Sequence, residues 1–154
     1  MGQRHTVTLE FKSTYEMLDF VQIASDHLGR LAGLDDESLH WVGVAVRESV
    51  INAIKHGNAG DEGKHVYVEF TPIDTHRPAG IVIRVRDEGP GFDPEALPDP
   101  LAPENMLKSS GRGIFLIRSF MDELVLRRAP EGGMEVVMVK RVAATEFLQQ
   151  NAGE

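Results

Sequence analysis

The pattern of apolar and polar residues predicts five short strands along the chain. In the first of them, Val7, Leu9 and Phe11 alternate with polar residues, as expected of a strand with one buried face. The last two strands flank a proline- and glycine-containing turn, which predicts a closing hairpin. The expected strands span residues 6–12, 65–70, 81–86, 124–128 and 134–141.

Apolar residues at helical spacing predict three helices. The first begins at Ser13, a suitable N-cap, and ends at Gly29. The second opens with acidic residues at the positive end of its dipole and stops at Gly57. The expected helices span residues 13–28, 34–56 and 114–121.

The order of the elements predicts the fold class. Because most strands follow another strand directly, the sheet is expected to be mixed or antiparallel, with the helices on one face. This is an α/β fold of the α+β kind, a two-layer sandwich and not a doubly wound parallel sheet. A length of 154 residues suits a single domain, 1–154, with a sizeable core.

Composition and charge narrow the classes of function. The formal net charge is −8, from 16 basic and 24 acidic side chains. This argues against direct binding of nucleic acid or of an anionic membrane, since both need a basic face. The chain has no cysteine, so disulfides and thiol catalysis are excluded. Without a signal peptide or a membrane-spanning apolar run, a cytoplasmic protein is expected.

The second predicted helix carries a line of polar side chains opposite its apolar stripe. Glu48, Asn52 and Lys55 follow at spacings of four and three residues, so they stack along one side. A solvated face with a helical ion pair would explain these three residues. However, the same side is apolar further back, at Trp41 and Val44, which favours a pocket near the C-terminal half. The apolar stripe consists of Leu39, Val42, Val46, Val50, Ala53 and Ile54.

A carboxylate and a carboxamide one helical turn apart suit magnesium–phosphate chemistry. Mg²⁺ prefers oxygen ligands and keeps several waters, so the amide oxygen of Asn52 and phosphate oxygens could suffice. Glu48 could hold a water ligand of the metal or accept a proton from an attacking hydroxyl. Lys55 could neutralise phosphate charge.

The predicted strand at residues 81–86 runs into Asp87 and then into a turn with two glycines around a proline. Gly89 and Gly91 allow backbone angles, and an approach to a ligand, that a side chain would obstruct. Asp87 could accept hydrogen bonds from an exocyclic amine such as that of adenine. A sharp turn without a ligand would explain the same residues.

A second glycine-rich stretch, Gly111-Arg112-Gly113, leads into the third predicted helix. Free backbone N–H groups at the positive end of a helix form a phosphate site. Lys108 and Arg112 could add hydrogen-bond donors there, because both are basic and lie close to the glycines in the sequence. A glycine loop before a core helix explains the stretch equally well.

The order and spacing of these three stretches resemble the ATP-binding superfamily that includes gyrase, Hsp90-type chaperones, histidine kinases and MutL. Residues 48–57 resemble its N-box, residues 87–91 its first glycine box and residues 111–114 its second. The small size and the run GRGIFLIRSFMDEL, residues 111–124, are most similar to the bacterial anti-sigma-factor serine/threonine kinases. The resemblance implies the Bergerat-type ATP-binding fold.

The resemblance also implies ATP and Mg²⁺ as cofactors and a role for each residue. Glu48 would be the general base, Asn52 would ligate Mg²⁺, and Asp87 would bind the adenine amine. The remaining implied contacts are a base pocket at Gly89 and Gly91, phosphate contacts at Gly111 and Gly113, and an ATP lid at about residues 93–112.

Kinases of this family phosphorylate a serine or threonine of an anti-sigma-factor antagonist, and they bind and inhibit a sigma factor. The resemblance therefore implies both proteins as partners, and the acceptor hydroxyl would come from the antagonist. The apolar first strand could lie at an exposed edge, which leaves a homodimer open.

Three alternatives differ in activity or partner. The first is an ATP-binding partner-switch module that transfers no phosphate, although Glu48 argues for a base. The second is a detached catalytic domain of a histidine kinase, which Lys55, three residues after Asn52, also suits. The third is an ATPase or switch kinase of a stress-signalling complex.

Overall fold

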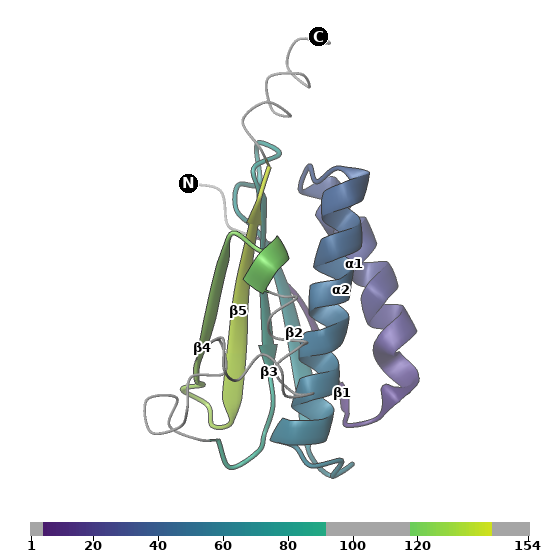
Figure 1. Cartoon of the computed structure of the whole chain (residues 1–154), viewed down its shortest axis with the longest axis vertical. Coiled ribbons are helices and arrows are strands. Elements are labelled where there is room, and N and C mark those ends of the chain that lie inside the picture. The colour runs from purple at the N-terminus through teal and green to yellow at the C-terminus, as the bar shows by residue number, and fades with distance from the viewer. Residues whose placement is uncertain (1–4, 92–117, 143–154) are drawn as a thin grey trace, which may run out of the picture.

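A computed structural model of the chain describes residues 5–91 and 118–142. Within these ranges two long helices lie beside a sheet of five strands (Figure 1). A 3₁₀ turn, Tyr15–Met17, precedes the first helix, and a π turn, Ala53–Gly57, extends the second. The elements are β1 (Val7–Lys12), α1 (Leu18–Leu31), α2 (Asp36–Asn52), β2 (His65–Pro72), β3 (Gly80–Arg86), β4 (Glu123–Arg128) and β5 (Met134–Arg141).

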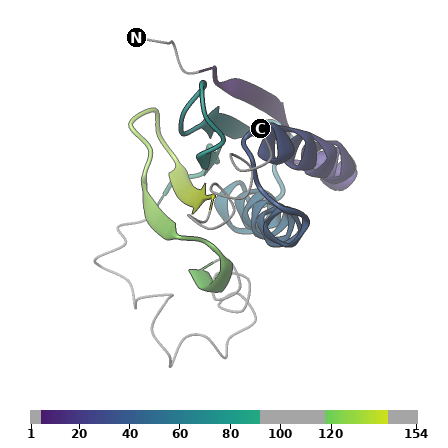
Figure 2. The same cartoon turned by 90° about the horizontal axis from the view of Figure 1, so that it is seen from above.

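The strands form one sheet in the order β1-β2-β3-β5-β4, with β3 at its centre. Each neighbouring pair of strands is antiparallel. Of the mixed and antiparallel sheets that the element order allowed, the described strands therefore form the antiparallel one. Both helices lie on one face of the sheet (Figures 1 and 2). The predicted two-layer sandwich is therefore confirmed.

The core lies between the sheet and the two helices. The apolar stripe predicted on the second helix is buried along its whole length, and it packs against the inward residues of the central strands. Burying each large apolar side chain contributes about 1.5–3 kcal/mol, so this contact orients α2 on the sheet. The inward residues are Val66, Val68, Phe70, Ile81, Ile83, Val85 and Met138.

The predicted start of the first helix is wrong. The Ser13 hydroxyl caps no helix: it donates to the carbonyl oxygen of Lys64 at 2.7 Å and accepts from the side chain of Asn58 at 2.8 Å. The helical turns begin with Tyr15–Met17 instead. Ser13 was therefore recruited by a tertiary contact, which outweighs its local capping tendency.

The predicted end of this helix at Gly29 is wrong as well. Gly29 lies inside α1, which continues to Leu31. A Cβ atom at Gly29 would come within 2.7 Å of Cδ2 of Leu39 on α2. The glycine thus lets the two helices approach closely, and the left-handed residue after the helix is Gly33, with a φ of 96°.

The second helix forms as its sequence predicts. The side chain of Asp35 caps it by accepting a hydrogen bond from the backbone N–H of Ser38 at 2.8 Å. Asp36 and Glu37 occupy the first turn, where their negative charges interact favourably with the positive end of the helix dipole. The helical winding ends with the π turn at Gly57.

The predicted closing hairpin is confirmed, since β4 pairs with β5 from Glu123↔Val139 to Arg128↔Met134. Of the third predicted helix, residues 118–120 are helical, and residues 114–117 lie outside the described residues. β1 is an edge strand, as expected, with Val7 40% exposed. In the described parts of the chain, no helix is long and apolar enough to cross a bilayer.

Candidate functional site

One flank of α2 carries Glu48 and Asn52, both half-buried and one turn apart, and Lys55 follows as an exposed side chain in the π turn. Two turns before Glu48, on the same flank, Trp41 stacks on Phe120 with ring centroids 3.6 Å apart and planes 8° apart. This flank is therefore turned toward the segment at residues 118–121 and is not simply a solvated face.

The helix changes its winding directly after Asn52. The backbone N–H of Asn58 donates to the carbonyl oxygen of Ala53, five residues earlier, at 2.8 Å. Such π turns are rare and often occur at functional sites. Here the turn brings Gly57 so close to Asp87 that a Cβ atom on the glycine would lie 2.0 Å from Oδ2.

Asp87 follows β3 directly and is only 5% exposed. Its Oδ1 accepts hydrogen bonds from the backbone N–H groups of Gly89 at 2.9 Å and Met134 at 3.1 Å. Within residues 5–91 and 118–142, no donor to Oδ2 is found. A buried carboxylate with one oxygen fixed and the other open can accept an N–H donor of a ligand, and it fits the exocyclic amine of adenine.

Glycines surround this carboxylate because the backbones approach too closely for side chains. A Cβ atom at Gly89 would lie 1.9 Å from the carbonyl oxygen of Gly57. Gly91 has a φ of 71°, which favours glycine. On the opposite side, Gly133 has a φ of 81°, and a Cβ atom there would lie 2.1 Å from the carbonyl oxygen of Asp87.

Asn58 is a site residue that the sequence did not reveal. It is 1% exposed, and its Nδ2 donates to Ser13 Oγ at 2.8 Å and to the carbonyl oxygen of His65 at 2.9 Å. Its Oδ1 accepts from the backbone N–H of Glu88 at 2.8 Å. The carboxylate of Glu88 in turn accepts from the N–H of His65 at 2.6 Å. Asn58 thus fixes the residue that follows Asp87.

Three polar groups follow one another along α2 and its π turn: the Asp87 carboxylate beside Gly57, the Asn52 amide and the Glu48 carboxylate. Gly57 touches Asp87, Asn52 lies five residues earlier, and Glu48 lies a further four residues earlier. At an α-helical rise of 1.5 Å per residue, the step of four residues from Asn52 to Glu48 corresponds to about 6 Å. The series of base acceptor, amide and carboxylate suits a nucleotide lying along the helix with its base near Gly57.

Four predicted site residues and the predicted lid, at about residues 93–112, lie outside the described residues. Their roles therefore stay predictions. These residues are Lys108, Gly111, Arg112 and Gly113.

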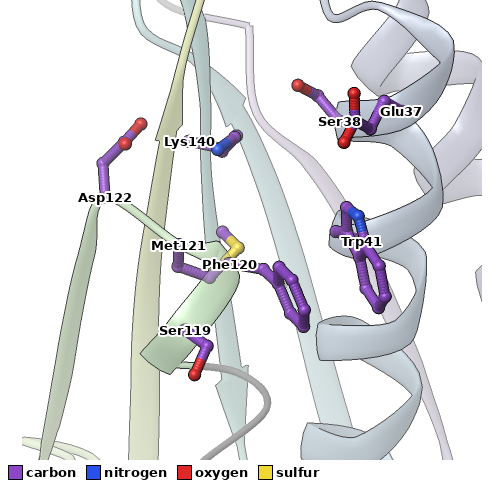
Figure 3. A pocket seen from close by; sticks show the side chains of 8 residues that line it. All are labelled: Glu37, Ser38, Trp41, Ser119, Phe120, Met121, Asp122 and Lys140. Carbon is purple, nitrogen blue, oxygen red and sulfur yellow. The ribbon is translucent and has the colours of Figure 1, made fainter.

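A hollow of about 240 Å³ lies at the other end of α2, between its first turns and the residues that enter β4 (Figure 3). The rings of Trp41 and Phe120 form one side of it, and Lys140 comes from β5. Neither Asn52 nor Asp87 lines this hollow, so it is separate from the series of groups along α2.

The family model of the histidine kinase-like ATPase domain matches residues 11–140 of this chain. The chain belongs to the histidine kinase-like ATPase domain family. The match spans the π turn, Asp87 and the β4–β5 hairpin, so the whole described site lies inside the family domain. The predicted family is confirmed, and for an ATPase domain the nucleotide is ATP.

Curated relatives of this ATPase domain extend over most of the chain. Serine-protein kinase RsbW of Listeria monocytogenes is 26% identical over 152 residues, 95% of this chain and 92% of that protein. The anti-sigma F factor of Oceanobacillus iheyensis is 32% identical over 148 residues, 93% of this chain and 97% of that protein. Serine-protein kinase RsbW of Staphylococcus epidermidis is 27% identical over 155 residues, 96% and 92% of the two chains. These names agree with the anti-sigma-factor kinases that the sequence resembles.

In this ATPase domain, Gly57→Ala is expected to weaken ATP binding at least about tenfold, because the new methyl group would displace the Asp87 carboxylate. Isothermal titration calorimetry measures the effect. Gly63→Ala is the matched control in the following loop, since its Cβ would meet only the exposed carboxylate of Asp61, at 3.1 Å. Equal affinities of the two variants would show that the contact between Gly57 and Asp87 does not shape the binding site.

Proposed function

We propose that the chain is an ATP- and Mg²⁺-dependent protein serine/threonine kinase, with the activity in a single domain, 1–154. Its substrate is an anti-sigma-factor antagonist, and it also binds and inhibits a sigma factor. The observation that carries the proposal is the series along α2: Glu48 and Asn52 lie one turn apart on a half-buried flank that ends at Asp87. A module that only bound ATP would need no general base, so the carboxylate at Glu48 favours phosphoryl transfer.

In the proposed reaction each residue has a separate task. Asp87 orients the nucleotide by accepting the adenine amine through Oδ2, while its Oδ1 stays bound to the backbone. Glu48 accepts the proton of the acceptor hydroxyl, which the partner protein supplies. Lys55 and the predicted phosphate contacts balance the charge of the phosphates.

Mg²⁺ would neutralise charge on the transferring phosphoryl group when bound. In the described residues, no group of three or more histidine or acidic side chains is placed to hold a metal by itself. The half-buried amide of Asn52 would therefore hold the ion together with phosphate oxygens, a donor set that Mg²⁺ accepts.

Asn52→Ala is expected to remove most of the dependence of ATP binding on magnesium. The amide oxygen is the proposed protein ligand, so its loss leaves the ion held by phosphate and water alone. Titrations of ATP with and without Mg²⁺ measure this dependence. The exposed neighbour His56 provides the control His56→Ala, for which the magnesium effect should persist. If Asn52→Ala retains it in full, the metal is held by other residues.

The two protein partners are proposed from the relatives. One relative is named a serine-protein kinase and another an anti-sigma F factor. The described residues include the proposed base, Glu48, and the proposed Mg²⁺ ligand, Asn52, and a separate antagonist protein would present the acceptor hydroxyl.

Phosphotransfer, read by intact mass, tests the proposal directly. The protein is incubated with Mg-ATP and candidate antagonist proteins encoded in the same genome. A single added phosphate on a serine or threonine of one candidate is the expected result. Phosphate on a histidine of a partner would favour the histidine-kinase alternative instead. ATP binding without transfer to any of the antagonists would favour the partner-switch module that transfers no phosphate.

A further inference from the structure

The turn between β4 and β5 is tied to β3 by the carboxylate of Glu131. Its Oε1 lies 2.9 Å from Nη2 of Arg84, and its Oε2 lies 3.4 Å from Nε of Arg86. Nε of Arg86 makes no hydrogen bond within the described residues, so this second contact is purely electrostatic. Both arginines stand at the end of β3, and Asp87 is the next residue. Glu131 therefore connects the turn to the strand that carries Asp87.

The last residue of this turn and the first residue of β5 contact Asp87 itself. The backbone of Met134 exchanges two hydrogen bonds with it: its N–H donates to Oδ1 at 3.1 Å, and its carbonyl oxygen accepts from the Asp87 N–H at 3.0 Å. Gly133 packs against the Asp87 carbonyl oxygen, as described above. The turn and the end of β3 lie at the same end of the sheet as the end of α2 (Figure 1). The end of the turn and the start of β5 thus help to hold the carboxylate in place.

Apolar packing contributes little to the turn itself, although Met134, the first residue of β5, is buried. Arg127, Arg128 and Pro130 are exposed, whereas Ala129 is buried and adds only a methyl group. A segment that buries little apolar surface is easily displaced unless polar contacts hold it. Hydrogen bonds and ion pairs therefore set where the turn lies.

The arginine that binds Glu131 is itself fixed from the other side. Arg84 also pairs with Glu69, at 3.4 Å, and with the fully buried Glu135. Burial alone would lower the pKa of the Arg84 guanidinium, but its hydrogen bonds to Glu131 and Glu135 outweigh this and raise the pKa. The hydrogen bond from Arg84 lowers the pKa of the Glu131 carboxyl, so Glu131 is ionised at neutral pH. An immobilised cation makes Glu131 a firmer anchor than an isolated surface pair.

We propose that Glu131 is a positioning residue for adenine recognition: it clamps the β4–β5 turn onto β3 and so holds Asp87 in place for the exocyclic amine. This inference rests on the proposed function, in which Asp87 accepts that amine. Loss of the clamp would release the turn and weaken the contact with the amine. It would not affect contacts to the phosphates.

Comparing ATP with purine riboside triphosphate, which lacks the exocyclic amine, isolates the contact in question. The wild-type protein is expected to prefer ATP by about tenfold or more, because a buried acceptor is left unpaired by the analogue. Glu131→Ala should reduce this preference about fivefold and change the affinity for the analogue by less than about twofold. Raising the salt concentration should reduce the wild-type preference but not that of the variant, because the ion pair is screened.

Glu123→Ala is the matched control. Glu123 is an exposed residue of the same hairpin that pairs with Arg141 at its far end, so its loss should leave the preference for ATP unchanged. Equal losses for both nucleotides in Glu131→Ala would show a merely structural role, and an unchanged preference would show no role; either overturns the inference. If neither the wild type nor Asp87→Asn distinguishes the two nucleotides, the role of Asp87 in the proposed function fails, and the inference fails with it.

Discussion

Glu48→Gln is expected to lower the rate of phosphotransfer by about 10²–10⁴-fold, the contribution typical of a general base. The substitution keeps the size and shape of a half-buried side chain but removes its ability to accept a proton. Because Asp87 and Asn52 are untouched, the affinity for Mg-ATP should stay within about threefold. Single-turnover transfer to the antagonist, followed by intact mass, measures the rate without product release.

Glu37→Gln provides the matched control, since Glu37 is an exposed glutamate in the first turn of the same helix. It should leave the rate unchanged. A Glu48→Gln variant that loses both rate and magnesium affinity would mean that Glu48 holds a water ligand of the metal. A variant that keeps the full rate would leave the reaction without a base on this chain.

The fold could be predicted from the sequence because its elements follow local patterns. Apolar runs on both sides of a proline- and glycine-containing turn mark the closing hairpin, and the apolar stripe of α2 is buried as its spacing predicts. Two local signals were misleading. Ser13 and Gly29 resemble helix ends, but the first binds Lys64 and Asn58 and the second packs against Leu39. Contacts between residues far apart in the sequence determine the role of both residues, and a local sequence pattern does not reveal such contacts.

Half of the site was predictable for the same reason. Glu48 and Asn52 share one helix flank, so their spacing alone places them together. The surroundings of Asp87 come from two distant segments, one at Gly57 and Asn58 and the other at Gly133, and no local pattern places them beside Asp87. The conformation of Gly133 suits a hairpin turn, and nothing in its neighbours reveals that it faces a carboxylate 46 residues earlier.

The substitution Asn58→Ala is expected to destabilise the fold by about 2–4 kcal/mol, since buried donors and acceptors that lose a partner cost about 1–3 kcal/mol each. Asn58 makes three side-chain hydrogen bonds, to Ser13, His65 and Glu88, and it is 1% exposed. This is a large share of the roughly 5–15 kcal/mol that stabilises a typical domain. Urea unfolding of the nucleotide-free protein measures the free energy of unfolding.

Because Asn58 joins the start of β2 to the residue after Asp87, its loss should affect binding as well as stability. At a temperature where the variant is still folded, its affinity for ATP should fall several-fold. Asp61→Ala is the control in the same loop. Among the described residues, its exposed carboxylate accepts only from the Gly63 N–H, at 2.9 Å, so stability should change by less than about 1 kcal/mol. If Asn58→Ala lowered the free energy of unfolding by less than about 1 kcal/mol as well, water would be replacing the hydrogen bonds of the amide. The turn at Asp87 would then be held by its glycines and by Met134 alone.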